Sequence, residues 1–335
     1  MKRTAIAIAM SAVTMPALAL SPSVGEPGFS GQINLGLGAG NVESNFLAET
    51  IGIDLSDKTL DSLNSNDDED ITMPVAGFDL GWTFSGGNMR VSIGADDRGE
   101  ALDFDPATKL AFRYDNDRFG NVELAGLGSR GFTDVWADPY DTTKDRSNSE
   151  ITSSGGRLTW DKIFSSNFEV MIETREIDLD DEDSGNSIAR LTAADRKLLE
   201  REGDVNRISL GYVFELNDRH SLRPAITYVD HDLDGDAMSR DGVVGKLGYG
   251  YRGDSFNLNV VGKYGQFDGD KTNPIFDDVN DIDTYSLGAS VQFPGLFGLD
   301  KWVPNASAIY AESDSDIDFN DAQVWIVSFA MFRKF

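Results

Sequence analysis

The sequence WIVSFAMFRKF, which runs from Trp325 to Phe335 and ends the chain, has the alternation of a β-strand with one apolar face. Side chains along a strand point to opposite faces in turn, so every second residue shares a face. One face here carries Trp325, Val327, Phe329, Met331, Arg333 and Phe335. Arg333 alone departs from the apolar character of this set. The stretch therefore predicts a long amphipathic strand with aromatic rings near both ends.

A strand of this kind that ends on an aromatic residue resembles the closing strand of Gram-negative outer-membrane β-barrels. The resemblance implies that Trp325, Val327, Phe329, Met331 and Phe335 form the signal that the barrel-assembly machinery reads. It also implies periplasmic chaperones, outer-membrane lipid and lipopolysaccharide as partners, and a location in the cell outer membrane. Arg333 lies near the end of the strand, where a long side chain can reach water or lipid headgroups.

The N-terminus has the features of an export signal. Lys2 and Arg3 precede an apolar run over 5–18, and Ala17-Leu18-Ala19 has the small-x-small pattern of a signal-peptidase site. We expect cleavage after Ala19, which gives a signal peptide over 1–19 and a single barrel domain over 20–335. No stretch reaches the roughly 20 apolar residues that a membrane-spanning helix needs. The chain has no cysteine, which excludes thiol chemistry and a disulfide scaffold.

Alternating runs of roughly ten residues, the span of a tilted barrel strand, recur along the chain from Phe29 onward. The connections between them alternate in length. Short ones are predicted at 85–88, 116–121, 164–167, 216–220, 252–255 and 294–301. Long ones are predicted near 43–70, 97–106, 130–150, 178–204, 230–241, 267–283 and 312–321. This pattern predicts an all-β, up-and-down antiparallel transmembrane barrel of about 14 strands, with 12 or 16 as alternatives, short periplasmic turns and long extracellular loops.

Aromatic residues gather at the predicted strand ends. The periplasmic ends carry Trp82, Phe84, Phe112, Tyr114, Trp160, Tyr212, Phe214, Tyr249, Tyr251, Phe293 and Phe335, and the outer ends carry Tyr228, Tyr264, Tyr285, Tyr310 and Trp325. Rings at both water–lipid boundaries are typical of membrane barrels. The alternative, a β-sandwich core, fits less well because sandwich strands are shorter and core rings do not gather at strand ends.

Three short motifs carry a more specific resemblance. Gly28-Phe29-Ser30-Gly31, Trp136-Ala137-Asp138-Pro139-Tyr140 and Asp183-Ser184-Gly185 look like an outer-membrane family catalogued only as a domain of unknown function. The resemblance covers most of the mature chain. It implies the location and the barrel, and it implies no activity and no functional residue.

The chain is strongly acidic, with a formal charge of −28 that becomes about −30 without Lys2 and Arg3. Such a surface repels nucleic acid, so the sequence excludes nucleic acid as a partner. Most carboxylates fall in the predicted long loops, with dense runs at 67–70, 178–183, 230–236 and 312–318. Two interpretations stay open: a solvated surface, or binding of Ca²⁺ or Mg²⁺, which clustered carboxylates suit and which could bridge the loops to lipopolysaccharide.

One acidic run has a metal-like spacing. Asp230, Asp232, Asp234, Asp236 and Asp241 mimic the oxygen ligands of an EF-hand loop. The run joins two strands instead of two helices, and Asp241 replaces the usual glutamate. Both a calcium site and a chance match in an Asp-rich chain are compatible with this pattern. We expect no other cofactor.

Two of the long loops have ordered features. In the 178–204 loop, Thr192 can cap a short helix through Asp195, and Leu191, Leu198 and Leu199 form an apolar stripe. This helix can pack on the barrel rim or fold inward as a partial lid. The Asp-Pro turn within 136–140 is a second candidate lid, because aromatic-rich Asp-Pro turns tend to be ordered.

The lumen is the main candidate site. The face opposite the lipid residues carries Arg90, Arg113, Arg157, Glu169, Glu173, Arg175, Arg207 and Arg223. Across the barrel, Asn34, Gly36, Gly38, Ser286, Gly288 and Ser290 form a wall of small side chains. A charged wall that faces a slim wall predicts an aqueous constriction like that of diffusion porins. The alternative is a lumen filled by mutually neutralising ion pairs, and only loops could plug it further.

These features predict a porin-like channel for passive diffusion of small hydrophilic solutes or ions. The alternative is a structural or adhesive barrel whose acidic loops bind divalent cations. A rim hydrolase is a third hypothesis, because His231 lies between Asp230 and Asp232 and an Asp–His pair can activate water. The chain has no Gly-x-Ser-x-Gly motif, and we do not expect an enzyme.

Overall fold

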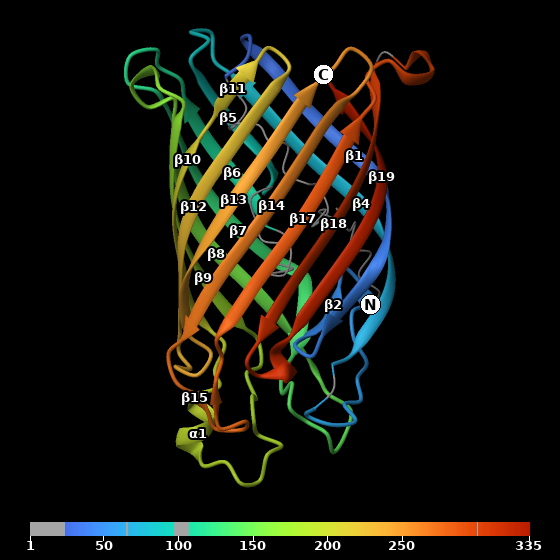
Figure 1. Ribbon diagram of the computed structural model, residues 1–335, viewed down its shortest axis with the longest axis vertical. Coiled ribbons are helices and arrows are strands. Elements are labelled where there is room, and N and C mark those ends of the chain that lie inside the picture. The colour runs from blue at the N-terminus through green and yellow to red at the C-terminus, as the bar shows by residue number, and fades with distance from the viewer. Residues whose placement is uncertain (1–23, 65, 97–106, 300) are drawn as a thin grey trace, which may run out of the picture.

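The computed structural model describes residues 24–64, 66–96, 107–299 and 301–335. Within these ranges the chain forms a closed antiparallel barrel of 14 strands (Figure 1), which confirms the predicted fold and excludes 12 or 16 strands. The barrel strands are β1 (Gly28–Ser44), β4 (Asp68–Thr83), β5 (Met89–Ala95), β6 (Thr108–Tyr114), β7 (Asn121–Trp136), β8 (Asn148–Asp161), β9 (Phe168–Leu179), β10 (Gly203–Tyr212) with its continuation β11 (Phe214–Asn217), β12 (His220–Leu233), β13 (Arg240–Arg252), β14 (Asn257–Gly269), β17 (Ile282–Gln292), β18 (Trp302–Ser315) and β19 (Ala322–Lys334).

The remaining elements lie in the connections. They are β2 (Leu47–Thr50), β3 (Ile53–Asp54), β15 (Thr272–Asn273), β16 (Asp278–Val279), the helix α1 (Ala193–Lys197) and the 3₁₀ turns η1 (Ile163–Ser165), η2 (Leu296–Gly298) and η3 (Asp318–Asn320). The long loops gather at the lower end of Figure 1, where α1 and β15 lie, and the C-terminus lies at the upper end. Among the described residues, no helix combines the length and the hydrophobicity that crossing a membrane requires.

The alternation of the sequence places apolar side chains on the outside of the barrel. Leu37, Leu110, Leu247, Leu287 and Phe329 are each more than half exposed to solvent, as expected of a surface that contacts lipid. The predicted outer ring of aromatics is confirmed: Tyr228, Tyr264, Tyr285, Tyr310 and Trp325 all face outward. Two of its pairs, Tyr264 with Tyr285 and Tyr310 with Trp325, are direct partners in the strand register.

The C-terminal strand closes the barrel against β1. Gln32 to Ser44 pair with Lys334 to Ala322, and the terminal Phe335 exchanges two backbone hydrogen bonds with Gly31. Its ring stacks on Phe29 at 5.6 Å between centroids. The guanidinium of Arg333 lies 5.6 Å from the centre of the Trp302 ring, a cation–π contact that accounts for a cation at an otherwise apolar step. The role of this strand as an assembly signal stays a prediction.

Gly36 is required where β1 approaches β19. A Cβ at this position would lie 2.2 Å from the carbonyl oxygen of Phe329, a backbone atom that cannot turn aside. Gly36 was predicted only as part of a wall of small side chains. It also allows the first and last strands of the barrel to pair closely.

The loops are shorter than predicted because several strands continue beyond the apolar band. The loop expected over 230–241 narrows to 234–239, since β12 runs to Leu233 and β13 begins at Arg240. Polar residues at these strand ends keep their ladder pairing beyond the apolar band, so polarity alone placed the boundaries too early. The signal peptide and its cleavage site lie outside the described residues.

A hairpin from the first long loop folds into the barrel. β2 pairs with the outer end of β7, where Leu47 lies opposite Val135 and Thr50 opposite Thr133. This edge of β7 extends past its pairing with the short β6, so the hairpin supplies the missing partner. Leu47, Ile53 and Leu55 then pack on inward-facing residues of β1, β4, β18 and β19. A loop thus covers the inner face of β1, β4, β18 and β19 in the half of the barrel nearest the long loops.

Candidate functional site

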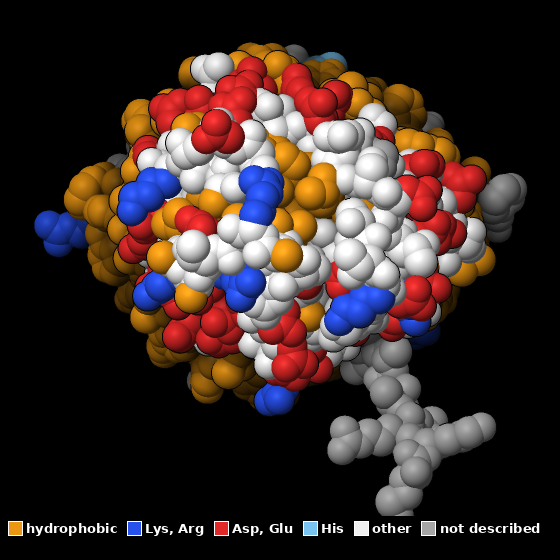
Figure 2. Space-filling model, turned by 90° about the horizontal axis from the view of Figure 1, so that it is seen from below, with side chains coloured by type: hydrophobic (Ala, Val, Ile, Leu, Met, Phe, Trp, Pro, Cys, Tyr) orange, Lys and Arg blue, Asp and Glu red, His pale blue; other side chains and the backbone are white. Residues whose placement is uncertain are grey.

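A cap of packed loops covers the outer end of the lumen. Its apolar core consists of Leu60, Tyr140, Leu191, Leu199, Met238, Ile275, Ile317 and Phe319, with Phe46, Leu63, Ile188, Leu233 and Phe276 packed against it. Within the described residues these side chains come from six of the long connections and from one strand end. Figure 2 views this face and shows acidic side chains around apolar ones. We call this cluster the cap.

Aromatic rings hold the centre of the cap. Tyr140 is fully buried and lies 5.1 Å from Phe319 and 6.2 Å from both Phe46 and Phe276, measured between ring centroids. Burial raises the pKa of the Tyr140 hydroxyl, which donates to Met238 Sδ at 3.9 Å. The predicted order of the 136–140 turn is confirmed, and its tyrosine joins loops that are far apart in sequence.

Arg146 connects the cap to the first long loop. Its guanidinium lies 4.5 Å from the centre of the Trp136 ring and donates to the Asn45 carbonyl at 3.0 Å, to the Asp57 carbonyl, and to Asp67 at 2.7 Å. Burial lowers the pKa of Arg146 and raises that of Asp67, in each case against the attraction of the partner. Burial is the largest cause of both pKa shifts, and the hydrogen bonds of the guanidinium tie separate loop segments together.

The predicted helix in the 178–204 loop is confirmed as α1. Thr192 accepts a hydrogen bond from the Asp195 amide, and Asp195 accepts from the Thr192 amide in return. The hydrogen bonds that the Asp195 carboxylate accepts from the Thr192 amide and hydroxyl lower the pKa of Asp195. Leu191 and Leu199, on either side of the helix, insert into the cap. The residues that flank the helix therefore anchor it to the cap, and its action as a partial lid stays a prediction.

An ion-pair network lies on the inner wall of the barrel below the cap. Arg157 bonds Asp96 at 2.6 Å and Glu173 at 2.5 Å, and Arg175 bonds the same two carboxylates at 2.7 Å and 2.9 Å. Arg207 joins Glu173 at 2.8 Å. The side chains of Asp96, Arg157 and Glu173 are at most 2% exposed. At this level the described inner wall carries mutually neutralising ion pairs, and a lumen filled by them stays a prediction.

The other predicted lumen residues lie nearer the end of the barrel with the short turns. Arg90 bonds Asp79 at 2.6 Å, and Arg113 bonds Asp115 at 2.7 Å and Asp161 at 2.8 Å. Glu169, on β9, pairs in register with Asp161, and Arg223, on β12, lies on the inward face. All eight candidates thus lie on the lumen side. Four of them join the central network, and the other four lie toward the short turns. Their role at a constriction stays a prediction.

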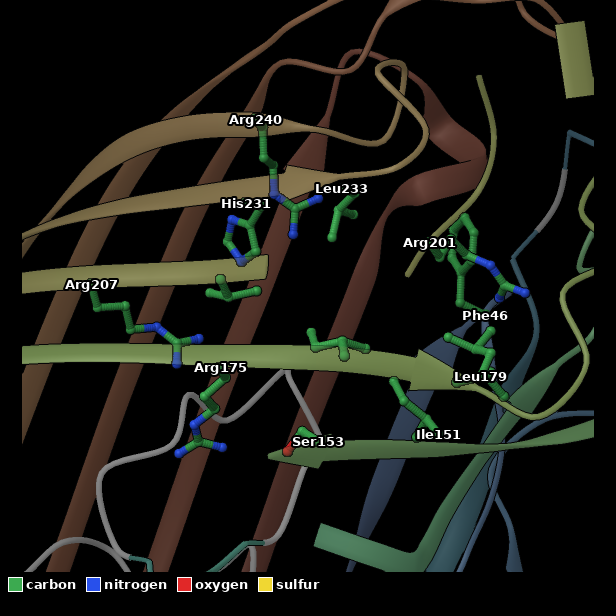
Figure 3. A pocket seen from close by; sticks show the side chains of 13 residues that line it. Phe46, Ile151, Ser153, Arg175, Leu179, Arg201, Arg207, His231, Leu233 and Arg240 are labelled. Atoms are coloured by element: carbon green, nitrogen blue, oxygen red, sulfur yellow. The ribbon is translucent and has the colours of Figure 1, made fainter. Parts of the chain in front are cut away.

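A cavity of about 200 Å³ lies between the cap and the network (Figure 3). Arg175, Arg207, His231 and Arg240 gather at one end, and Phe46, Ile151, Leu179 and Leu233 lie toward the other. The described residues that line it are Phe46, Val135, Ile151, Ser153, Arg175, Ile177, Leu179, Arg201, Val205, Arg207, His231, Leu233 and Arg240. This lining includes four arginines and no carboxylate. Phe46 and Leu233 also pack on the cap, so the cavity lies directly beneath it.

His231 does not form the expected Asp–His pair. It lines the cavity, whereas Asp230 and Asp232 have the parity of Tyr228, whose ring is exposed on the outer side of β12. Within the described residues no hydrogen bond reaches His231 Nδ1, which is buried. A rim hydrolase would need its histidine base and an orienting carboxylate on the same face of the strand. Here His231 and its neighbouring aspartates lie on opposite faces.

The EF-hand-like residues lie around one hairpin. Asp230 and Asp241 are direct partners in register, Asp232 follows on β12, and Asp234 and Asp236 lie in the turn, where Lys271 pairs with Asp236. In the part of the chain that the structure describes, no group of three or more metal-ligating side chains comes together. Calcium binding by these residues stays a prediction.

Sequence reasoning missed Asp96, the cavity and the cap as a unit. Asp96 follows β5 directly, and only its position after an inward-facing Gly94 hinted that it could reach Arg157. His231 was noticed for its acidic neighbours, although alternation along β12 already placed it on the inner face with Val229.

Comparison with known proteins gives a family and a distant likeness. A family model described as "Protein of unknown function (DUF2860)" matches residues 28–332. No curated protein matches the chain.

Solved outer-membrane barrels resemble the chain at low identity. A Pseudomonas aeruginosa FadL homologue is 13% identical over 91% of this chain and 90% of its own, with a TM-score of 0.44. The outer membrane channel DcaP of Acinetobacter baumannii is 11% identical over 91% and 97%, with a TM-score of 0.43. The Pseudomonas putida toluene transporter TodX is 10% identical over 97% and 93%, with a TM-score of 0.42. No conclusion on function follows from likeness this low.

Proposed function

The chain belongs to the DUF2860 family of unknown function, and from its geometry we propose that it is an outer-membrane channel for small hydrophilic solutes whose outer mouth the cap closes. The apolar exterior, the aromatic ring and the aromatic C-terminus support a place in the outer membrane of a Gram-negative bacterium. They also support lipopolysaccharide, periplasmic chaperones and the barrel-assembly machinery as partners.

One observation carries the proposal: a charged lumen lies beneath a closure that is built from loops. The cap core consists almost entirely of loop side chains, and the 14 barrel strands keep their own ladder hydrogen bonds without it. Loops of this kind can move while the barrel stays intact. The passive diffusion expected from sequence, in which a plug formed by loops stayed open, is in this proposal restricted to the times when the cap has moved.

The test is single-channel conductance in planar bilayers, with Phe319→Ala as the loosened cap. Phe319 is 1% exposed and contacts three other rings of the cap, so its loss leaves a cavity worth about 3–5 kcal/mol of packing. We expect rare openings of the unaltered protein and a clearly larger open fraction in the variant. Phe329→Ala, which removes a lipid-facing ring of the same size, is the matched control and should leave conductance unchanged.

If neither the unaltered protein nor the Phe319→Ala variant conducts although both are folded, the proposal is wrong. Equal open fractions for the two alanine variants would show that the cap does not control the path.

A second candidate function, a structural or adhesive barrel with cation-binding loops, has one observation in its favour. Asp230 and Asp241 lie directly opposite each other on β12 and β13, and like charges in that position repel unless a counterion separates them. Calorimetric titration with Ca²⁺ tests it, and Asp241→Asn should remove the heat. A titration without heat contradicts this function.

A further inference from the structure

A neutral polar surface covers part of the inner wall where β14, β17, β18 and β19 lie side by side (Figure 1). Direct partners in register share one face of the sheet, and two adjacent rows of partners here have the inward parity of Val324 and Ile326, which pack inside the barrel. The first row consists of Asn259, Ser290, Ser307 and Ser328, and the second of Asn257, Gln292, Asn305 and Ala330. None of these side chains is charged. We call the two rows the neutral face.

The neutral face lies toward the end of the barrel with the short turns. Asn257 is the first residue of β14 and Gln292 is the last of β17, so the second row lies near that mouth, and both side chains are partly exposed. Ser307 and Ser328 are recessed in the wall and share a hydrogen bond of 2.7 Å between their hydroxyls. The cap lies at the other end of the lumen. A solute from the short-turn mouth therefore reaches the neutral face without passing the cap.

Two buried amide oxygens on this wall lack a hydrogen-bond partner. Asn305, in the second row, is 6% exposed, and within the described residues no hydrogen bond reaches its Oδ1. Asn34, on the neighbouring β1, is 4% exposed and has an Oδ1 in the same state. Buried polar atoms are nearly always paired, so two unpaired acceptors on one wall call for an explanation. A ligand that donates hydrogen bonds supplies the missing partner.

The ionic side chains of the lumen hold one another. Besides the central network, Arg90 bonds Asp79 at 2.6 Å. Arg113 likewise bonds Asp161 at 2.8 Å. An ion that leaves water for the neutral face loses hydration and meets no opposite charge there. An uncharged polyol instead exchanges its hydrogen bonds to water for hydrogen bonds to amides and hydroxyls, which donate and accept as its own hydroxyls do.

We propose that the neutral face binds small uncharged polyhydroxylated solutes of about the size of a monosaccharide, held by Asn305, Gln292 and the serines of the first row. The inference rests on the proposed function insofar as it names the class of solute that the channel takes. It is tested by binding, which does not require conduction, so that the site and the channel can fail separately.

The experiment measures binding to the full chain folded in lauryldimethylamine oxide, a detergent without sugar groups, by titration of saturation-transfer NMR signals. The probes are glucose, glucuronate and glucosamine, which share one ring and differ in charge. Glucose should bind, and the two charged sugars should bind at least about tenfold more weakly, because each loses hydration without meeting an opposite charge.

Two variants place the binding on the neutral face. Asn305→Leu and Gln292→Leu keep the size of the side chain and remove its hydrogen bonds, and each should weaken glucose binding about two- to tenfold. The matched control is Asn206→Leu, the same change on the outward face of β10, where Ile208 is exposed. It should leave glucose binding unchanged. Heat-modifiable electrophoretic mobility verifies that each variant is folded, and either lumen variant decides the question if the other does not fold.

The proposal is overturned if glucose does not bind or if the charged sugars bind as tightly as glucose. It is also overturned if the folded lumen variants bind glucose like the unaltered protein, or if Asn206→Leu weakens binding as much as they do. Conductance in bilayers without glucose binding would reject this site and leave the channel function intact. Glucose binding by a barrel that never conducts would support the site and reject the channel.

Discussion

The cap and the ion-pair network are two packed clusters at neighbouring levels of the barrel, and they are built with opposite chemistry. The cap is apolar and consists of loop side chains such as Tyr140 and Phe319, which meet above the barrel. The network is charged, and most of its members, such as Arg157 and Glu173, lie on neighbouring strands. The first is held by exclusion of water and the second by pairs of charges on a rigid frame.

This difference in chemistry indicates which of the two clusters can move. Strands β8, β9 and β10 are fixed by continuous ladders, so the arginines and Glu173 stay in place whatever the loops do. The loops of the cap are fixed mainly by their shared apolar core and by a few polar contacts, among them those of Arg146. We therefore expect substitutions in the network to destabilise the whole barrel, and substitutions in the cap to destabilise the loops alone.

The largest expected effect follows removal of the shared carboxylate of the network. Glu173→Ala leaves Arg157, Arg175 and Arg207 with one carboxylate fewer in a buried setting, which costs about 3–5 kcal/mol. The midpoint of urea unfolding, followed by tryptophan fluorescence, should fall accordingly. Glu176→Ala, on the exposed face of the same strand, should change little. If both variants unfold at the same midpoint, the network does not support the barrel.

A smaller and local effect is expected in the cap. Arg146→Met removes the contacts to Asn45, Asp57 and Asp67 and should loosen the first long loop by about 1–3 kcal/mol. Limited proteolysis should then cut this loop faster, while the unfolding midpoint of the barrel stays unchanged. Arg130→Met, at an exposed guanidinium, is the control. If the unfolding midpoint of the barrel falls together with faster cleavage, the cap and the network are one cooperative unit.

The smallest effect concerns pH at the edge of the cap. Burial, with nearby Asp314 and Asp318, raises the pKa of Asp321, which accepts a hydrogen bond from the Ser315 amide at 2.8 Å. An acid whose folded pKa is raised destabilises the fold when ionised. That penalty is fully present above the folded pKa and disappears as pH falls toward the unfolded value.

Asp321→Asn should therefore protect the last loop slightly at pH 7, because Asn keeps the acceptor without the charge. The difference from the unaltered protein should vanish under acid conditions, as measured by proteolysis of the 316–321 loop across pH. A difference that persists or grows as pH falls contradicts this sign.

The sequence by itself determined the barrel, because its information is local and periodic. Alternation along β19 placed Trp325 and Phe329 outside, the spacing of turns gave the number of strands, and the Thr192–Asp195 pair gave α1. The inward face of β8 and β9 followed from the same period, so Arg157 and Glu173 could be assigned to the lumen before any contact was known.

Only the tertiary structure decided what fills that lumen. Phe46, Tyr140 and Phe319 belong to loops that have no repeating pattern, and nothing in their local sequence indicates that their rings meet. The inward course of the β2–β3 hairpin, the bonds of Asp96 to Arg157 and Arg175, and the cavity at His231 depend in the same way on packing between distant segments. Strand periodicity specifies which way a side chain points, and long-range packing specifies what it meets there.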